Sequence, residues 1–169
     1  MAKITLVTGG ARSGKSSFAQ QMAEAKSERP VYLATARIWD EDFAQRVKRH
    51  QADRDERWVN VEEEKQLSKH DFSGKVVLMD CVTLWLTNFF HDSEYKLDEA
   101  LEAAKAEWKL FIQQDMELIV VTNELGMGVH PEHEVARKFA DLQGWMNQHI
   151  AKGADAVYLL VSGIPVKIK

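Results

Sequence analysis

Ile4-Thr5-Leu6-Val7-Thr8-Gly9-Gly10-Ala11-Arg12-Ser13-Gly14-Lys15-Ser16 is the stretch that decides the fold. Its second half fits the pattern Gly-x-x-x-x-Gly-Lys-Ser, the P-loop or Walker A pattern. An apolar, β-branched run precedes the pattern and a helix-forming run follows it, as a P-loop requires. The glycines let backbone N–H groups converge on phosphate oxygens, and the N-terminus of the following helix adds positive potential. The stretch therefore predicts a nucleoside triphosphate site, and the complete motif disfavours an ordinary glycine turn.

We assign roles within this loop and to one later acid. Lys15 is the predicted catalytic cation that reaches the β- and γ-phosphates, and Ser16 is a predicted Mg²⁺ ligand. The apolar run Lys75–Asp80 ends in an acid, which is the Walker B pattern, so Asp80 is the second predicted Mg²⁺ ligand and a nucleotide contact. Acids also end strands without such a role, and only the preceding P-loop makes the pattern informative. The predicted nucleotide contacts in the loop are Gly9, Gly10, Ala11, Arg12, Ser13, Gly14, Lys15 and Ser16.

Length, charge and cysteine content limit the class of protein. The 169 residues suit one domain, residues 1–169. A net charge of −4 argues against a broad nucleic-acid or anionic-membrane surface. The single cysteine, Cys81, excludes a disulfide within the chain, favours the reducing cytoplasm and is expected to be a small buried side chain. The sequence has no apolar run of the length needed to span a membrane.

The order of the predicted elements indicates an α/β fold. A strand, a helix and the second apolar run Val31–Thr35 imply a right-handed crossover and a mostly parallel, RecA-like sheet flanked by helices. Ligands of such sheets bind at the carboxyl ends of the strands, so Thr35, Ala36 and Arg37 are predicted to face the nucleotide. Near the C-terminus, Ala156–Ser162 reads as a strand, and after Gly163 the residues 164–169 read as an antiparallel edge strand.

The remaining segments are expected to be helical or short strands. Residues 58–62 read as a strand, 63–69 as a charged helix-like segment, and 82–90 as an apolar segment that is core, pocket wall or subunit contact, with a mixture of core and contact favoured. A helix is expected to begin at Pro131. The apolar face of the helix over 97–111 is predicted to be Leu97, Leu101, Ala104, Trp108 and Phe111. That of the last helix is predicted to be Ala136, Phe139, Ala140 and Leu142–Trp145.

His50 lies in the charged segment 40–57, where Phe43, Val47 and His50 recur at helical spacing. The residues alone leave two interpretations open. One is a solvated charged helix with an incidental histidine, and the other is a functional face that carries His50 among Arg46 and Arg54.

Several stretches together resemble the bifunctional adenosylcobinamide kinase/adenosylcobinamide-phosphate guanylyltransferase family of the cobalamin pathway. The resemblance covers nearly the whole chain, and the loop Thr122-Asn123-Glu124-Leu125-Gly126-Met127-Gly128 and the C-terminal tail are its most specific parts. The stretches that carry it are Leu6–Ser16, Tyr32–Ala36, Arg46–Arg54 with Trp58, Val121–Gly128 and Val161–Lys169.

This resemblance implies two reactions. The first phosphorylates the hydroxyl of adenosylcobinamide with ATP or GTP, and the second transfers GMP from GTP to that phosphate through a GMP–histidine intermediate. The family's His-x-x-x-Arg pattern falls on His50–Arg54, which makes His50 the implied nucleophile. A neutral imidazole is a suitable nucleophile near pH 7. The further nucleotide contacts that the resemblance implies are Gln51, Ala52, Asp53, Arg54 and Glu62.

The resemblance also implies a homotrimer with sites near subunit boundaries, and 82–90 is the segment expected to contribute to it. Two positions depart from the family pattern. Trp145 stands where some relatives have arginine, and Asp80 stands where relatives often have glutamate. Two other functions remain open on the sequence: a P-loop kinase of another small molecule with a structural His50, and a RecA-type assembly ATPase.

Overall fold

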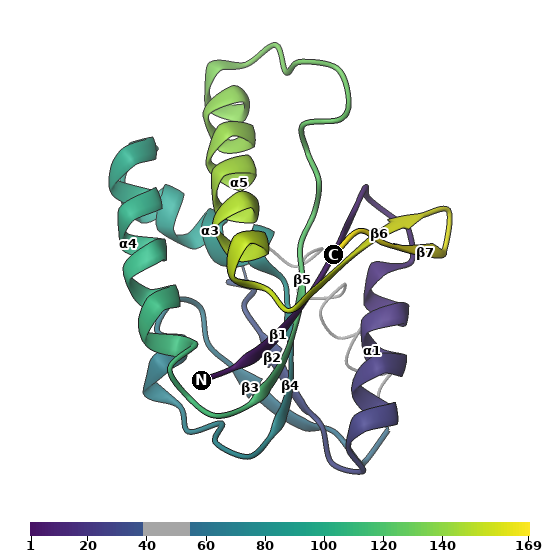
Figure 1. Cartoon of the computed structure of the whole chain (residues 1–169). Coiled ribbons are helices and arrows are strands. Elements are labelled where there is room, and N and C mark those ends of the chain that lie inside the picture. The colour runs from purple at the N-terminus through teal and green to yellow at the C-terminus, as the bar shows by residue number, and fades with distance from the viewer. Residues whose placement is uncertain (39–54) are drawn as a thin grey trace.

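The protein is described by a computed structural model over residues 1–38 and 55–169 (Figure 1). The strands are β1 (Lys3–Gly9), β2 (Val31–Ala34), β3 (Val59–Glu62), β4 (Val76–Asp80), β5 (Glu117–Val121), β6 (Ala156–Val161) and β7 (Ile164–Lys167). The helices are α1 (Lys15–Lys26), α3 (Val82–Asp92), α4 (Leu97–Phe111) and α5 (Glu134–Gly153), with one 3-10 turn, η1 (Leu67–Lys69). In the described ranges, no helix has the length and apolar content that a bilayer crossing requires.

The strands form one seven-stranded sheet in the order β3-β2-β4-β5-β1-β6-β7. Every neighbouring pair is parallel except β6 and β7, which pair antiparallel at the edge. The predicted α/β fold, with a mostly parallel sheet and an antiparallel C-terminal edge strand, is therefore confirmed. The register sets Ala34 beside Asp80 and Asp80 beside Val121, so the residues that follow these strands meet at one sheet edge.

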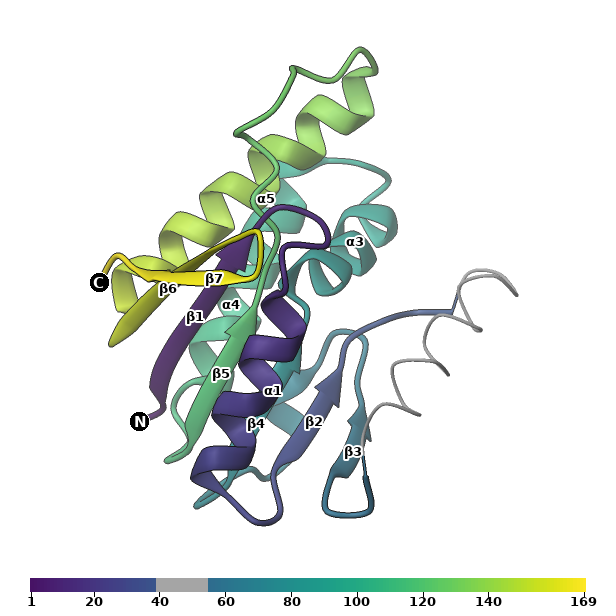
Figure 2. The same cartoon turned by 90° about the vertical axis from the view of Figure 1, so that its right-hand side faces the viewer.

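Helices cover both faces of the sheet (Figure 2). The helix α1 lies on one face, where Ala19 and Ala23 pack against strand residues such as Leu78 and Ile119. The helices α3, α4 and α5 cover the opposite face. Adjacent strand residues point to opposite faces, so parallel strands covered on both sides are apolar along their whole length. This arrangement explains why β4 and β5 read as continuous apolar runs.

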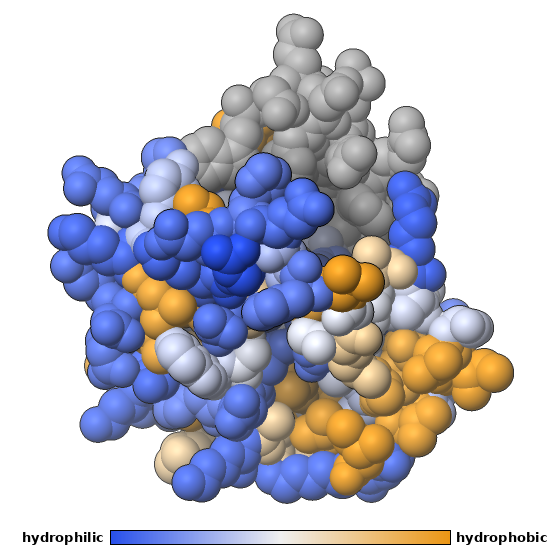
Figure 3. Space-filling model, turned by 90° about the horizontal axis from the view of Figure 1, so that it is seen from above, coloured by the Kyte–Doolittle hydropathy of each residue, from blue (hydrophilic) through white to orange (hydrophobic). Residues whose placement is uncertain are grey.

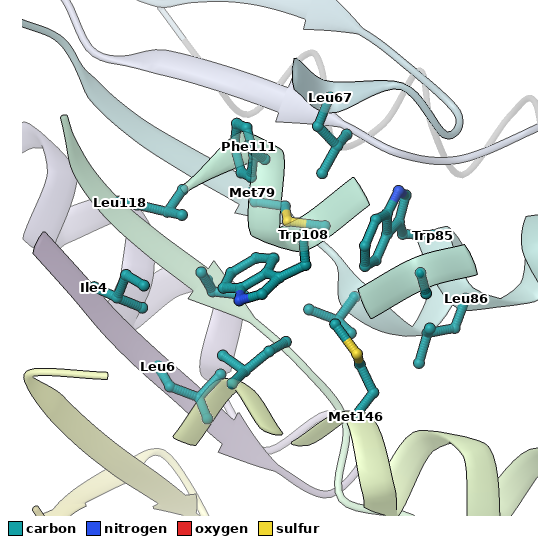
Figure 4. Close-up of a cluster of buried hydrophobic side chains, with 14 of the residues drawn as sticks. Ile4, Leu6, Leu67, Met79, Trp85, Leu86, Trp108, Phe111, Leu118 and Met146 are labelled. Carbon is teal, nitrogen blue, oxygen red and sulfur yellow. The ribbon is translucent and has the colours of Figure 1, made fainter. Parts of the chain in front are cut away.

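The larger core lies between the sheet and α3, α4 and α5 (Figure 4). Trp85, Trp108 and Phe111 are buried there, and the Trp85 ring meets Phe89 edge-on at 5.1 Å. Burying a large apolar side chain contributes about 2–3 kcal/mol, so these aromatic residues dominate the packing. The predicted inward face of α4 is thereby confirmed. In α3, Val82, Leu86 and the aromatic residues are also buried within the chain, which confirms the core part of the prediction for 82–90.

Two helix predictions are wrong in detail. The helix α5 begins at Glu134 rather than Pro131, because the Pro131 carbonyl accepts a bond from the Arg137 guanidinium (3.1 Å) instead of entering a helical ladder. Its buried face contains Leu142, Met146 and Ile150, whereas Ala136 and Trp145 are exposed.

The segment 63–69 is not a helix, apart from η1, because the carboxylate of Glu63 ties the chain into a turn. Its Oε1 accepts bonds from the backbone N–H groups of Lys65 (3.0 Å) and Gln66 (2.9 Å), and its Oε2 faces Lys69 and His70. Burial raises the pKa of Glu63, but these hydrogen bonds outweigh burial and hold its pKa at about 2.

The depressed pKa predicts a loss of stability in acid. Above pH 4.5, the usual pKa of a glutamate, the Glu63 carboxylate is charged in the folded and the unfolded state, and its hydrogen bonds stabilise the fold fully. This stabilisation is lost as the pH falls from 4.5 to about 2. Urea unfolding between pH 5 and pH 2.5 should therefore show a steeper decline for the wild type than for Glu63→Gln. Glu62→Gln is the matched control for removing one charge. Parallel curves for the wild type and Glu63→Gln would show that Glu63 contributes nothing to acid sensitivity.

Candidate active site

The P-loop joins β1 to α1 through two glycines whose backbone no other residue could adopt easily. Gly9 has φ +153°, and a Cβ atom there would lie 2.6 Å from the carbonyl oxygen of Leu160 in β6. Gly14 has φ +92° and is the N-cap of α1. Both values favour glycine. The sequence motif is thus realised as a tight backbone turn that leads directly into a helix N-terminus.

The turn between β6 and β7 supports this loop from outside. The backbone N–H of Gly163 donates to the carbonyl of Ser13 (2.8 Å), and a Cβ atom at Gly14 would lie 3.1 Å from the Cα of Gly163. Sequence reasoning missed this contact, because the residues are far apart in the chain and only the strand order brings them together. The C-terminal hairpin is therefore part of the scaffold of the site.

Lys15 is buried in the loop that precedes it. Its Nζ donates to the carbonyl of Gly10 (2.5 Å) and lies 3.5 Å from the Ser13 hydroxyl. Burial lowers the pKa of Lys15, and the nearby carboxylate of Asp80 opposes part of that shift. A buried ammonium at this point is a strong attractor for phosphate oxygens, since few water molecules screen it.

The loop opens into a cavity of about 680 Å³. Residues from three strand ends and the start of α1 surround it, and this volume is in the range of small-molecule sites. Of the predicted nucleotide contacts, six consecutive P-loop residues and Asp80 line the cavity, whereas Gly9 and Gly10 do not. The residues that line it are Ala11, Arg12, Ser13, Gly14, Lys15, Ser16, Ser17, Asp80, Cys81, Val121 and Asn123.

Asp80 reaches the cavity from the end of β4 and is held by a residue that the sequence did not suggest. The phenolic O–H of Tyr32 donates to Asp80 Oδ2 (3.0 Å). The Tyr32 ring is buried and meets Trp58 edge-on at 6.1 Å. The thiol of Cys81 is buried as predicted, and burial raises its pKa to about 12, which makes it an unreactive side chain.

Thr35, Ala36 and Arg37 follow β2 but do not line the cavity in the described part of the chain. Thr35 is buried, and its hydroxyl exchanges hydrogen bonds with the backbone carbonyl and N–H of Cys81 (2.7 and 3.0 Å). Arg37 donates to Asp92 and Glu64, and the bonds to these acids raise the pKa of Arg37.

Glu62 lies at the end of the edge strand β3. His50, Gln51, Ala52, Asp53 and Arg54 lie outside the described residues, together with most of the charged segment 40–57. Their roles stay predictions. Asn123 is a polar cavity residue that the sequence analysis left without a role, although the specific loop to which it belongs was a signal.

The family model described as cobinamide kinase / cobinamide phosphate guanyltransferase matches residues 5–168. The bifunctional adenosylcobalamin biosynthesis protein CobU of Escherichia coli is 39% identical, over 98% of this chain and 99% of its own. The corresponding CobP of Pseudomonas aeruginosa is 36% identical, over 97% and 96%. Among solved structures, the flagellar accessory protein FlaH of Methanocaldococcus jannaschii covers 99% of this chain and 78% of its own at 13% identity and a TM-score of 0.48.

The close approach at Gly9 generates a stability prediction. Gly9→Ala should lower the free energy of unfolding by about 2 kcal/mol, because the added Cβ forces β1 and β6 apart at a strained φ. Gly10→Ala is the matched control, since a Cβ at Gly10 meets nothing within 4 Å. Chemical unfolding measures both, and equal stability of the two variants would contradict the proposed role of the β6 contact.

Proposed function

The chain belongs to the cobinamide kinase / cobinamide phosphate guanyltransferase family, and from this premise we propose how it acts on adenosylcobinamide. It first phosphorylates the hydroxyl of adenosylcobinamide with ATP or GTP. It then transfers GMP from GTP to the new phosphate, which gives adenosylcobinamide-GDP and pyrophosphate. The observation that carries the proposal is the P-loop cavity with Lys15, Ser16 and Asp80, in a chain that matches the family nearly from end to end.

The kinase step needs positioning and charge neutralisation. The substrate hydroxyl oxygen bonds to the γ-phosphorus and releases its proton to solvent. The bond from that phosphorus to the β–γ bridging oxygen breaks, and the nucleoside diphosphate leaves with the bond electrons. Backbone N–H groups of the P-loop hold the phosphates. The Lys15 ammonium, which lies on the Gly10 carbonyl, turns to the β- and γ-phosphates and offsets their growing charge.

We propose that Ser16 and Asp80 hold Mg²⁺ in this cavity. A hydroxyl and a carboxylate are hard oxygen donors that line the same cavity, which fits the ion's preference for oxygen ligands supplemented by phosphates and water. Mg²⁺ bound there supplies positive charge that neutralises the phosphate oxygens. Tyr32 orients the Asp80 carboxylate through its hydrogen bond.

The guanylyl transfer is assigned to His50 on the family resemblance. A ring nitrogen of the neutral imidazole bonds to the α-phosphorus of GTP, and pyrophosphate leaves. A phosphate oxygen of adenosylcobinamide phosphate then bonds to the same phosphorus, the P–N bond breaks, and the imidazole is restored. Arg46, Arg49 and Arg54 are candidates to stabilise charge on the phosphates, and Glu62 is a candidate contact for the guanine or ribose.

We further propose that the protein acts as a homotrimer in the cytoplasm, where its nucleotide substrates are abundant. Apolar side chains gather on the β6–β7 hairpin, at the lower right of the view in Figure 3. The exposed fractions are 53% for Val161, 65% for Ile164 and 60% for Ile168. An exposed apolar group of this kind suits a contact between subunits. In α3, Thr83, Leu84 and Thr87 are only partly buried, so this segment stays a second candidate for the contact.

Separating the two products tests the function directly. The purified chain is incubated with adenosylcobinamide, GTP and Mg²⁺, and the corrinoid products are resolved by chromatography and mass. The wild type should give adenosylcobinamide-GDP. His50→Ala should stop at adenosylcobinamide phosphate, and Lys15→Ala should lower both steps by about 10³-fold because each uses the P-loop. Full conversion to the GDP product by His50→Ala would overturn the histidine route, and failure of the wild type to phosphorylate adenosylcobinamide would overturn the function.

The Tyr32–Asp80 bond generates a prediction on metal use. Tyr32→Phe keeps the buried ring but removes the only O–H group of that side chain, so Asp80 is held less firmly. The Mg²⁺ concentration for half-maximal kinase rate should rise by about 10-fold, with the rate at saturating Mg²⁺ restored toward the wild type. A Mg²⁺ titration of both enzymes measures this. Identical titrations would show that the hydrogen bond does not tune the metal site.

A further inference from the structure

A buried polar cluster interrupts the apolar face beneath α5. Thr122, Gln143 and Asn147 have exposed fractions of 0%, 0% and 9%. Gln143 Nε2 donates to Thr122 Oγ1 (3.0 Å) and Asn147 Oδ1 (2.9 Å), and Thr122 Oγ1 donates to Asn147 Oδ1 (2.7 Å). We define these three residues as the amide cluster. All around it the face is built from apolar residues such as Leu142 and Met146.

In and beside the amide cluster, buried polar atoms lack hydrogen-bond partners, which lowers the stability of the fold. Among the described residues, Gln143 Oε1 and Thr8 Oγ1 are buried without a hydrogen-bond partner. Thr8 precedes the P-loop and lies beside Thr122, because the backbone bonds Thr122 N–H to Val7 O and Glu124 N–H to Gly9 O (each 3.0 Å) continue the β1–β5 pairing. A buried unpaired polar group costs about 1–3 kcal/mol. Apolar residues of the same size would fill this space more stably, so the cluster serves something other than packing.

The cluster holds Asn123, the one polar residue from β5's end that lines the nucleotide cavity. Asn147 Nδ2 donates to the Asn123 backbone carbonyl (3.0 Å). From the other side, the Asn123 backbone N–H and Nδ2 both donate to Thr83 Oγ1 (3.2 and 3.0 Å). Thr83 lies in the first turn of α3, whose N-cap Cys81 directly follows Asp80. Asn123 is therefore fixed between the amide cluster and the strand end that carries Asp80.

These bonds engage the backbone of Asn123 and one hydrogen of its side-chain amide, and they leave the other amide hydrogen and the amide oxygen available. An amide nitrogen carries two hydrogens and the amide oxygen accepts, so the second N–H of Asn123 remains for a ligand. Among the described residues, no hydrogen bond to Asn123 Oδ1 is present. The side chain shares the cavity with Lys15 and Asp80. An oriented neutral donor therefore lies in the same cavity as the Lys15 ammonium that binds phosphate.

We propose that Asn123 is a catalytic residue whose carboxamide N–H contacts the terminal phosphate during phosphoryl transfer, and that Gln143 and Asn147 are positioning residues acting through it. This inference rests on the proposed function, since it needs a triphosphate in the P-loop cavity. A fixed donor aimed at developing charge stabilises the transition state more than the ground state, because its orientation is set before the reaction. The amide cluster lowers the stability of the fold, but its hydrogen bonds maintain the orientation of Asn123.

The test is steady-state phosphorylation of adenosylcobinamide by ATP. Asn123→Ala should lower kcat by about 10²-fold with the KM for ATP nearly unchanged, as for loss of one transition-state donor. Gln143→Met, which keeps the volume but removes the amide, should lower kcat by about 10-fold, also at constant KM. In the double variant the loss should equal that of Asn123→Ala alone, because Gln143 acts only through Asn123. Gln148→Met, the same change at an exposed position of α5, is the matched control.

Wild-type kcat in Asn123→Ala, or a change confined to KM, would overturn the catalytic role. Gln143→Met with altered unfolding but unchanged kcat, or with a loss that adds to that of Asn123→Ala, would overturn the positioning role. A wild-type chain that transfers no phosphate would overturn the proposed function and this inference with it, whereas an active wild type with unaffected variants overturns this inference alone.

Discussion

At Gly9 the backbone of β1 passes so close to β6 that a Cβ atom would lie 2.6 Å from the Leu160 carbonyl, and the geometry of the site depends on this approach. The approach is possible because β1 and β6 pair in parallel up to Gly9 and Leu160. It brings the β6–β7 turn against Ser13 and Gly14, so the P-loop is held between its own strand and the C-terminal hairpin. The edge hairpin is thus structurally coupled to the nucleotide cavity.

The same sheet edge gathers the groups that the proposed chemistry needs. The strand order places β5 between β1 and β4, so Asn123 follows a strand that separates the P-loop from Asp80. Two polar residues at this edge are oriented by buried neighbours: Tyr32 holds Asp80, and Asn147 holds Asn123. Packed apolar layers on both faces keep the strand ends in place. A rigid sheet with preoriented polar groups at its carboxyl edge is a suitable frame for phosphoryl transfer.

Local patterns in the sequence were sufficient for the fold class and for part of the site. The P-loop could be predicted because its glycines, lysine and flanking elements are contiguous, and Asp80 because it ends an apolar strand. Tyr32 and Gly163 could not, because their contacts depend on strand order rather than on spacing along the chain. The predicted face of α5 missed Asn147, because it is a polar residue that is nevertheless buried, and included Trp145, an aromatic residue that is exposed. The helix expected over 63–69 failed because the Glu63 carboxylate bonds backbone N–H groups that a helix would use.

The central claim is that one chain, through its P-loop and His50, both phosphorylates its substrate and carries GMP covalently. The most direct measurement is incubation with GTP labelled at the α-phosphate, beside a γ-labelled control, followed by denaturation and peptide mapping. The account predicts α-label on the peptide that contains His50, stable to base and released by acid as a phosphoramidate requires, and absent from His50→Ala. Retention of no α-label, with γ-label passing to adenosylcobinamide, would contradict the covalent route and leave a kinase alone.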